Sequence, residues 1–308
     1  MTLLRSLLFA PGNHARRVAK ALTLDADAVI LDLEDACPIP DKVATRAVVV
    51  DALRQPRRAR GYVRINALST EFGYGDLVAV VQREVDGVML TKVNGPDDVK
   101  IADWLMTQLE RERGLPQGSV EVLPLIETGS GLANAEAIAR AAPRVRRLAF
   151  GAGDFTLDLG IRWTREETEL VAFRSTLVLA SRAAGVEPPI DLAWIDVQDA
   201  GGLANSIRWG RTLGFQGKLC IHPDHVGAIN EAFLAAAEGP MKGYLYFEKD
   251  ELVSSDFRSH PGSAIFDSPS TMVLDNDMVK TMGWYDNEYG YACRLVDLVQ
   301  FLQERGLS

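Results

Sequence analysis

Eight short apolar runs, separated by helix-like stretches, constrain the fold of this chain more than any other feature. They lie between residue 3 and about residue 235, and each leads into polar or glycine-bearing residues. The runs cover residues 4–10, 28–33, 62–65, 87–90, 122–126, 147–150, 190–192 and 218–221. Such alternation is typical of repeated βα units and a parallel sheet. Eight units in sequence favour an α/β fold of the (β/α)8 TIM-barrel type over an open doubly wound sheet.

Composition narrows the class of protein but not its chemistry. The 308 residues are 47% hydrophobic and 24% charged, which are ordinary globular values. A net charge of −9 argues against a general nucleic-acid or anionic-membrane binder, although a local basic cluster can still hold an anionic cofactor. Cys37, Cys220 and Cys293 lie far apart and fit reduced thiols of a cytoplasmic protein. No apolar run has the length of a signal peptide or a membrane span.

The pattern changes near residue 237, where we place a boundary between a barrel domain (1–237) and a C-terminal extension (238–308). Glu238-Gly239-Pro240 interrupts the last helical pattern, and β-like segments follow without intervening helices. Residues 243–247, 252–257 and 272–274 have the pattern of antiparallel strands. Residues 294–305 have apolar positions at helical spacing. We therefore expect an atypical α+β extension after the barrel.

Two of the apolar runs end at a carboxylate, one at Glu127 and the other at Asp154. The carboxyl ends of parallel strands are where α/β proteins keep their chemistry. Two acids from separate strands are consistent with a divalent cation that keeps positions open for water and substrate. The alternative is that each acid only caps the helix that follows, since acids are favoured at helix starts.

Further candidate residues follow the first three strands. Pro11-Gly12-Asn13 precedes a helix that carries Arg16, Arg17 and Lys20, which fits either a phosphate-binding loop or a solvated helix face. The second run ends in Asp32-Leu33-Glu34-Asp35. Three acids this close together repel one another unless a cation, an arginine or a shared proton relieves the repulsion. The third run delivers Arg64, which can neutralise these acids or hold a substrate carboxylate or enolate oxygen.

Later strand ends supply more charged groups. Lys92 follows the fourth run, and an ion-pair role is preferred over a Schiff-base role because nothing in the sequence indicates a lowered pKa. His222 and Pro223 follow the eighth run, where His222 is either an acid or base or a hydrogen-bonded structural residue. The seventh region contributes three acids to the rim, which are Asp191, Asp196 and Asp199.

These motifs together resemble the citrate lyase β-subunit family, which is part of the HpcH/HpaI aldolase and malyl-CoA lyase superfamily. The resemblance covers roughly residues 4–233. The matching segments, in order, are FAPGN, DAVILDLEDA, VRIN, LTKV, LPLIET, FGAGDFTLDLG, IDLAWID and CIHPDHV. The family fold is a (β/α)8 barrel, which agrees with the independent count of strands. One minor departure is Thr91, which stands where relatives usually have proline.

The resemblance implies roles for the residues at the rim. Glu127 and Asp154 match the family's Mg²⁺ ligands, and Arg64 matches the residue that contacts the carbonyl or enolate oxygen. Glu34 and Asp35 match the acidic pair beside the metal. The implied reaction is carbon–carbon cleavage of a 3-hydroxyacyl-CoA of the citryl-, malyl- or citramalyl-CoA type, through a thioester enolate.

The resemblance also implies a cofactor arm and an assembly. Arg16 and Lys20 fall where the family binds coenzyme A, and His222 and Pro223 match a segment that lines the acyl-CoA arm. The expected partners are a CoA thioester and a keto acid, with no nucleic acid and no membrane. The family forms trimers or hexamers, so we expect a homo-oligomer.

The C-terminal extension resembles another family, because GPMKGYLYF, LVSSDF, SAIFD and WYDNEYGYACRLVDL match the end of glyceraldehyde-3-phosphate dehydrogenase over residues 238–304. Asn287 matches an asparagine that touches the nicotinamide there. A dehydrogenase is not expected, since the dinucleotide glycine loop and the catalytic cysteine motif are missing. This extension replaces the lid that supplies an acid in the lyase family. A non-catalytic CoA-thioester-binding barrel therefore stays open as an alternative. Thioester hydrolysis and a malate synthase-like condensation stay open too, because the same site could support them if water or another acceptor enters.

Overall fold

The chain folds into two compact units. The computed structural model describes residue 4 and residues 6–24, 26–225, 245–248, 264–274 and 278–284. One unit comprises Met1–Val226 and Leu274–Met278, and the other comprises Gly227–Val273 and Val279–Ser308. The boundary predicted at residue 237 lies outside the described residues and stays a prediction.

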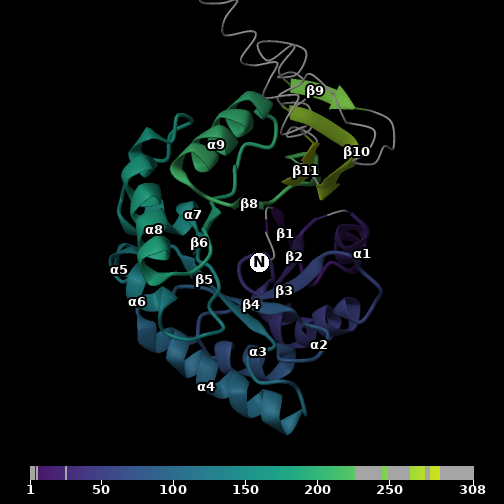
Figure 1. The fold of residues 1–308 in the computed structure, drawn as a ribbon. Helices are drawn as coiled ribbons and strands as arrows, with labels where there is room; N and C mark the ends of the chain where they lie inside the picture. The colour runs from purple at the N-terminus through teal and green to yellow at the C-terminus, as the bar shows by residue number, and fades with distance from the viewer. Residues whose placement is uncertain are drawn as a thin grey trace, which may run out of the picture. The chain divides into compact units, whose positions relative to one another are not determined.

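The first unit is a closed barrel of eight parallel strands, in which each strand pairs with the next and β8 pairs with β1 (Figure 1). The strands are β1 (Ser6–Pro11), β2 (Ala28–Asp32), β3 (Arg60–Ile65), β4 (Gly87–Leu90), β5 (Glu121–Ile126), β6 (Ala149–Phe150), β7 (Ile190–Asp191) and β8 (Gly217–Cys220). All eight overlap the apolar runs in the sequence. The predicted TIM barrel is thus confirmed, and the carboxyl ends of its strands form one rim.

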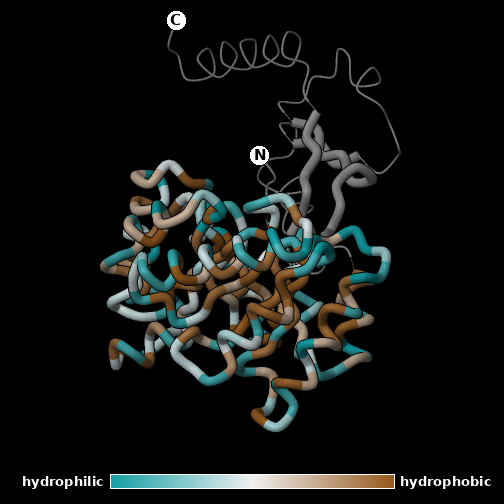
Figure 2. Tube along the Cα trace, turned by 90° about the horizontal axis from the view of Figure 1, so that it is seen from below, coloured by the Kyte–Doolittle hydropathy of each residue, from teal (hydrophilic) through white to brown (hydrophobic). Residues whose placement is uncertain are grey.

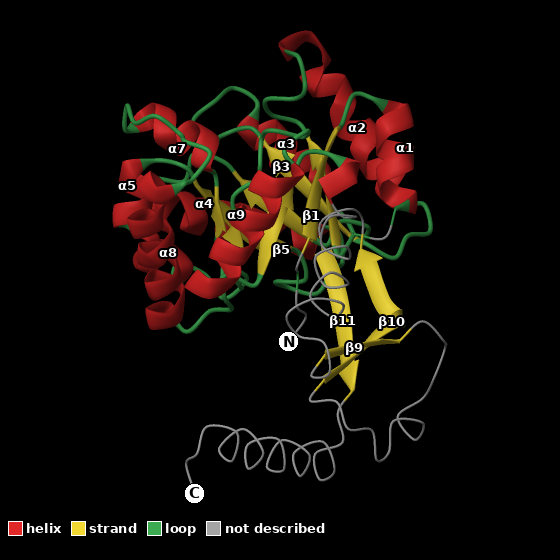
Figure 3. Ribbon diagram, turned by 90° about the horizontal axis from the view of Figure 1, so that it is seen from above, coloured by secondary structure: helices red, strands yellow, loops and turns green. Residues whose placement is uncertain are grey.

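Helices surround this barrel on the outside (Figures 1 and 3). The α-helices are α1 (Ala15–Thr23), α2 (Lys42–Leu53), α3 (Gly73–Val80), α4 (Pro96–Glu112), α5 (Gly129–Ala133), α6 (Ala135–Ala139), α7 (Ala152–Asp158), α8 (Val171–Ala184) and α9 (Ala200–Leu213). Three 3₁₀ turns are η1 (Ile39–Asp41), η2 (Thr168–Leu170) and η3 (Pro223–His225). Among the described residues, no helix is both long and apolar enough to cross a membrane.

The strands bury apolar side chains on both faces, which explains why they read as continuous apolar runs. Ala28 and Ile30 of β2 belong to a core cluster that fills the barrel, whereas Val29 and Leu31 pack in a second cluster beneath the helices. Figure 2 shows these hydrophobic segments concentrated inside the unit. Successive residues of a strand point to opposite faces, so this alternation fixes which strand-end residues face the barrel mouth.

The second unit contains a three-stranded sheet in the order β11-β10-β9, built from β9 (Leu245–Glu248), β10 (Ala264–Leu274) and β11 (Met278–Trp284). The prediction of antiparallel strands is wrong for β9 and β10, which pair in parallel. Residues 249–263 separate these two strands, and this length permits the crossover that a parallel pair needs. The strand predicted at 252–257 and the helix predicted at 294–305 lie outside the described residues.

Candidate active site

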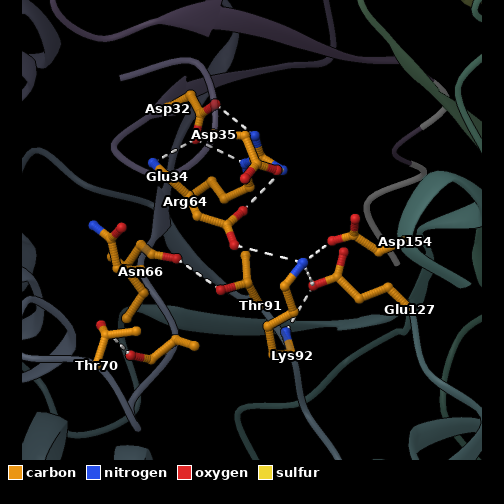
Figure 4. A network of polar contacts seen from close by, with 12 residues as sticks. Asp32, Glu34, Asp35, Arg64, Asn66, Thr70, Thr91, Lys92, Glu127 and Asp154 are labelled. Atoms are coloured by element: carbon orange, nitrogen blue, oxygen red, sulfur yellow. Dashed lines mark hydrogen bonds and ion pairs between the residues drawn. The ribbon is translucent and has the colours of Figure 1, made fainter. Parts of the chain in front are cut away.

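At the end of β3, an arginine is held by a buried aspartate (Figure 4). Arg64, on β3, donates from Nε to Oδ1 of Asp32 at 2.7 Å and from Nη2 to Oδ2 at 2.5 Å. Asp32 is 1% exposed and also accepts hydrogen bonds from the backbone N–H groups of Glu34 and Ala36. The Arg64 guanidinium lies 4.9 Å from the centroid of the Phe9 ring. These contacts hold the guanidinium in one orientation, because a bidentate pair fixes its plane.

The predicted acidic pair lies beside this arginine, but its two members differ. Glu34 is 8% exposed, and its Oε2 lies 3.1 Å from Nη1 of Arg64 without accepting a hydrogen bond from any described residue. Burial raises the pKa of Glu34 to about 7, and the charges of Asp35 and Glu127 add to the rise, whereas Arg64 and Lys92 oppose it. The Asp35 side chain is 65% exposed and lies 3.4 Å from Nη1 of Arg64. A carboxyl group with this pKa can gain or lose a proton near neutral pH.

Glu127 follows β5 directly and is 3% exposed. Its Oε1 accepts a hydrogen bond from the backbone N–H of Lys92 at 2.7 Å. Burial raises its pKa, with the charge and N–H of Lys92 acting in the opposite direction. Gly151 makes room for this side chain, since a Cβ at that position would lie 2.8 Å from the Cβ of Glu127. The absence of a side chain at Gly151 thus leaves space for the buried carboxylate of Glu127 at the end of β5.

The contacts of the two strand-end acids do not support the helix-cap alternative. Thr128, not Glu127, caps α5, and its side chain accepts a hydrogen bond from the N–H of Gly131. Asp154 lies in the first turn of α7, whose N-cap is Gly151, and that helix has no side-chain cap hydrogen bond. Asp154 gains at most a favourable interaction with the helix dipole.

Lys92 joins the acids from separate strands (Figure 4). Its Nζ forms an ion pair with Asp154 and lies 3.6 Å from Oε1 of Glu127 and 3.8 Å from Oε1 of Glu34. The ion-pair role expected from the sequence is thus confirmed. Its backbone φ is +53°, in the left-handed region that non-glycine residues rarely adopt. Strained backbone of this kind concentrates at functional sites.

The charge of the cluster favours a divalent cation. The five acids Asp32, Glu34, Asp35, Glu127 and Asp154 face two cations, so three negative charges are in excess when all are ionised. One ammonium group already lies within ion-pair distance of both Glu127 and Asp154. In the described part of the chain, no three His, Cys, Asp or Glu side chains converge on one point. Mg²⁺ needs only one or two carboxylates, with water and substrate completing its octahedron, so the pair fits Mg²⁺.

The predicted cofactor-binding residues do not contact this cluster. Arg16 and Lys20 are exposed on α1. His222 and Pro223 follow β8, and Nδ1 of His222 accepts a hydrogen bond from the N–H of Asp224 at 3.2 Å. The His222 side chain is 44% exposed. All four residues stay candidates for the cofactor arm on the basis of the sequence alone.

Comparison with known proteins places this geometry in a family. The sequence model of HpcH/HpaI aldolase/citrate lyase matches residues 5–223, which is more than half of the chain. The chain belongs to this family. Citrate lyase subunit beta of Haemophilus influenzae is 33% identical over 235 residues, which cover 76% of this chain and 80% of that protein.

Other members of the HpcH/HpaI family agree with the barrel and the reaction class. The L-malyl-CoA/beta-methylmalyl-CoA lyase of Cereibacter sphaeroides is 33% identical over 252 residues, covering 74% of this chain and 78% of that protein. The structure of CitE from Mycobacterium tuberculosis in complex with magnesium, acetoacetate and coenzyme A has a TM-score of 0.61 and 30% identity, covering 76% of this chain and 84% of that one. The curated relatives named here are lyases, which confirms the predicted enzyme class.

The C-terminal resemblance is also confirmed. The model of the glyceraldehyde 3-phosphate dehydrogenase C-terminal domain matches residues 221–287. This match begins before the predicted boundary at 237 and overlaps the end of the HpcH/HpaI match. Asn287 lies outside the described residues.

The structure decides between the alternatives for Asp32 and corrects the prediction for Asp191. Among the three crowded acids, Asp32 is relieved by an arginine, because it forms the bidentate pair that orients Arg64. Asp191 is not at the rim, because it is 1% exposed and pairs with Arg174 and Lys218 beneath the helices. Alternation along the strands gives the reason in both cases: Asp32 continues the inward set of β2, whereas Asp191 follows the inward Ile190 and points outward. The alternation of side chains along each strand is the sequence signal that separates these two acids.

The other two acids of the seventh region also have local partners. Asp199 caps α9 by accepting a hydrogen bond from the N–H of Gly202, and it pairs with Arg165. Asp196 accepts a hydrogen bond from the N–H of Gln198 at 3.1 Å. These local contacts explain both acids without a role in the site.

Proposed function

We propose that this protein is a Mg²⁺-dependent carbon–carbon lyase for a 3-hydroxyacyl-CoA thioester of the citryl-, malyl- or citramalyl-CoA type. The observation that carries the proposal is the convergence of Glu127 and Asp154 on one cation, Lys92, beside the clamped Arg64. Relatives named citrate lyase subunit beta and L-malyl-CoA/beta-methylmalyl-CoA lyase, and a structural neighbour in complex with magnesium and coenzyme A, support it.

Glu127 and Asp154 are the residues that would hold the metal. Both carry carboxylate oxygens, the ligand type that Mg²⁺ prefers. When bound, Mg²⁺ supplies Lewis-acid polarisation of the hydroxyl or keto oxygen next to the scissile bond. The buried position of Glu127 and the N–H group of Lys92 hold one of these carboxylates in place before the metal arrives.

Arg64 would stabilise the charge that develops during cleavage. As the bond between C2 and C3 of the acyl chain breaks, its electron pair moves into the thioester and forms an enolate. A guanidinium fixed by Asp32 meets this negative charge without reorganising, which is how preorganised donors lower a barrier. The enolate carbon then takes up one proton, which balances the proton lost from the 3-hydroxyl, and the keto acid and the shortened acyl-CoA leave.

Glu34 is the residue that would accept the proton of the substrate's 3-hydroxyl. Its pKa of about 7, set mainly by burial, lets it accept and release a proton at neutral pH. It lies between Arg64 and Lys92, with Oε2 free of hydrogen bonds from the described residues. Asp35, which is more exposed, would serve to tune the charge of the cluster.

The coenzyme A arm and the assembly complete the proposal. Arg16 and Lys20 present exposed cations that suit the phosphates of coenzyme A, and His222 and Pro223 would line the acyl arm. We expect a cytoplasmic homo-oligomer, either a trimer or a hexamer, and light scattering coupled to size exclusion would give its mass.

An assay of citryl-, malyl- and citramalyl-CoA, with Mg²⁺ or with EDTA, tests the reaction. We expect Mg²⁺-dependent formation of a keto acid and a shortened acyl-CoA. Release of the intact hydroxy acid would instead indicate thioester hydrolysis, and net formation of malyl-type thioesters a condensation. Tight CoA-thioester binding with no turnover of any substrate would refute the lyase.

Two substitutions test the metal ligands separately from the reaction. Glu127→Ala and Asp154→Ala should each weaken Mg²⁺ binding by about tenfold or more, since a lost ligand typically costs at least about 1.4 kcal/mol. The matched control is Glu112→Ala, on the exposed face of α4. Isothermal titration with Mg²⁺ alone measures the effect. Unchanged affinity in both variants would exclude a metal site at these residues.

A further inference from the structure

The ammonium group of Lys92 lies against the same carboxylates that are proposed to bind the metal. Nζ forms an ion pair with Asp154 and lies 3.6 Å from Oε1 of Glu127, although the lysine side chain is 35% exposed. Glu127 is nearly inaccessible to solvent. A buried carboxylate without a counter-charge is costly, so Lys92 stabilises the site when no metal is present.

The main chain of Lys92 is anchored separately from its side chain. The backbone N–H donates to Oε1 of Glu127 at 2.7 Å, and the residue keeps a φ of +53°. The side chain is joined to this anchored backbone by several single bonds and is 35% exposed. Lys92 can therefore move its charge while its N–H continues to hold Glu127.

A divalent cation and this ammonium group compete for the same oxygens. A metal coordinated by Glu127 and Asp154 would lie within a few ångströms of Nζ, and like charges that close repel strongly. Glu34 offers the nearest other carboxylate, because its Oε1 lies 3.8 Å from Nζ and its Oε2 accepts no hydrogen bond from a described residue. Figure 4 shows Lys92 with the metal-ligand candidates on one side and Glu34 on the other.

We infer that Lys92 is a displaceable internal cation, which occupies the metal position in the metal-free protein and moves to Glu34 when a divalent cation binds. The inference rests on the proposed metal site at Glu127 and Asp154. It assigns two tasks to one residue. Lys92 keeps the empty site folded, and its positive charge sets how much metal is needed to fill that site.

Mg²⁺ titration of EDTA-stripped full-length protein tests this inference. Lys92→Met and Lys92→Gln remove the charge but keep a side chain of similar reach, and either one is sufficient if the other fails to fold. Each should lower the Kd for Mg²⁺ by about tenfold or more, because a like charge about 4 Å away disappears. Lys92→Arg retains the charge and should bind Mg²⁺ much as the wild type does. Lys100→Met removes an exposed lysine of α4 and is the matched control.

Thermal unfolding provides a second readout that does not depend on activity. Without metal, Lys92→Met should melt below the wild type, and saturating Mg²⁺ should abolish or reverse the difference. An unchanged or higher Kd in both neutral variants would overturn the inference, even if the wild type binds Mg²⁺.

Glu127→Gln distinguishes this failure from that of the proposed function. If Glu127→Gln loses Mg²⁺ binding and the Lys92 variants bind Mg²⁺ as the wild type does, the proposed metal site is supported. Only the displacement of Lys92 is then refuted. Absence of Mg²⁺ binding in the wild type and in both neutral variants would overturn both. Binding that appears only when Lys92 is neutralised would support both.

Discussion

The stability of the metal-free protein should depend on pH through Glu34. Burial raises the pKa of this carboxyl group from 4.5 to about 7. The unfolded chain therefore releases the proton near pH 4.5, whereas the folded protein keeps it until about pH 7. Because the folded state binds more protons across this window, stability falls as pH rises, and the full penalty is present above pH 7. A shift of this size corresponds to roughly 3 kcal/mol.

Glu34→Gln removes the titrating group and should remove this pH dependence. Between pH 5 and pH 8 the stability of the variant relative to the wild type should increase by roughly 2.5 kcal/mol, after allowance for partial ionisation at pH 5. The attraction between Arg64 and ionised Glu34 is already included in the pKa of about 7, so it needs no separate allowance in this comparison. Urea unfolding in EDTA, followed by circular dichroism, measures the difference.

Asp35→Asn is the control, since it removes a neighbouring acid but leaves Glu34 in place. It should retain most of the pH dependence of the wild type. Parallel stability curves for the wild type and Glu34→Gln from pH 5 to pH 8 would refute the reasoning. That result would mean that water reaches Glu34 more freely than its 8% exposure indicates.

Two further substitutions test the geometry around Arg64 and Glu127. Asp32→Asn breaks the bidentate pair with Arg64 and should lower kcat by about 10²-fold, with a smaller change in KM. Steady-state assays measure both constants. An unchanged kcat would exclude the role of Asp32 in orienting Arg64. Gly151→Ala places a Cβ 2.8 Å from that of Glu127 and should cost about 1–3 kcal/mol in urea unfolding while weakening Mg²⁺ binding. Gly153→Ala, which has open space, is its control, and equal stability of the two variants would contradict the predicted clash.

The barrel could be predicted because every strand is apolar on both faces. A run such as β2, with Val29 and Leu31 beneath the helices and Ala28 and Ile30 inside, leaves a continuous apolar signal in the sequence. The sheet of the second unit gave a weaker signal. Strand direction depends on connections that are not encoded in local periodicity, so the parallel pairing of β9 with β10 was missed.

For strand-end residues, alternation of side chains along the strand decides whether a residue faces the candidate active site. Position at the strand end alone does not. Leu123 and Leu125 fill the barrel, and Glu127 continues their series two residues on. Tyr62 fills it too, and Arg64 is the next residue in that series. Asp191 directly follows the inward Ile190, so its side chain points out of the barrel, where it pairs with Arg174. Counting in steps of two from a core residue therefore separates Arg64 and Glu127 from Asp191.

Asp154 and Lys92 are not placed by this count, because Asp154 lies five residues after the inward Ala149, in the first turn of α7, and Lys92 lies three residues after the inward Met89. Met89 lies inside the barrel, so continued alternation would turn Lys92 outward, towards the helices. The left-handed backbone at Lys92 interrupts the alternation, and the side chain instead meets Glu127 and Asp154. The strain at this residue is offset by the hydrogen bond and ion pairs that it permits, because a left-handed residue persists only where its surroundings require it. Backbone conformation thus brings a cation to the mouth of the barrel, where acids outnumber it, and such an arrangement is poised to exchange that cation for a metal.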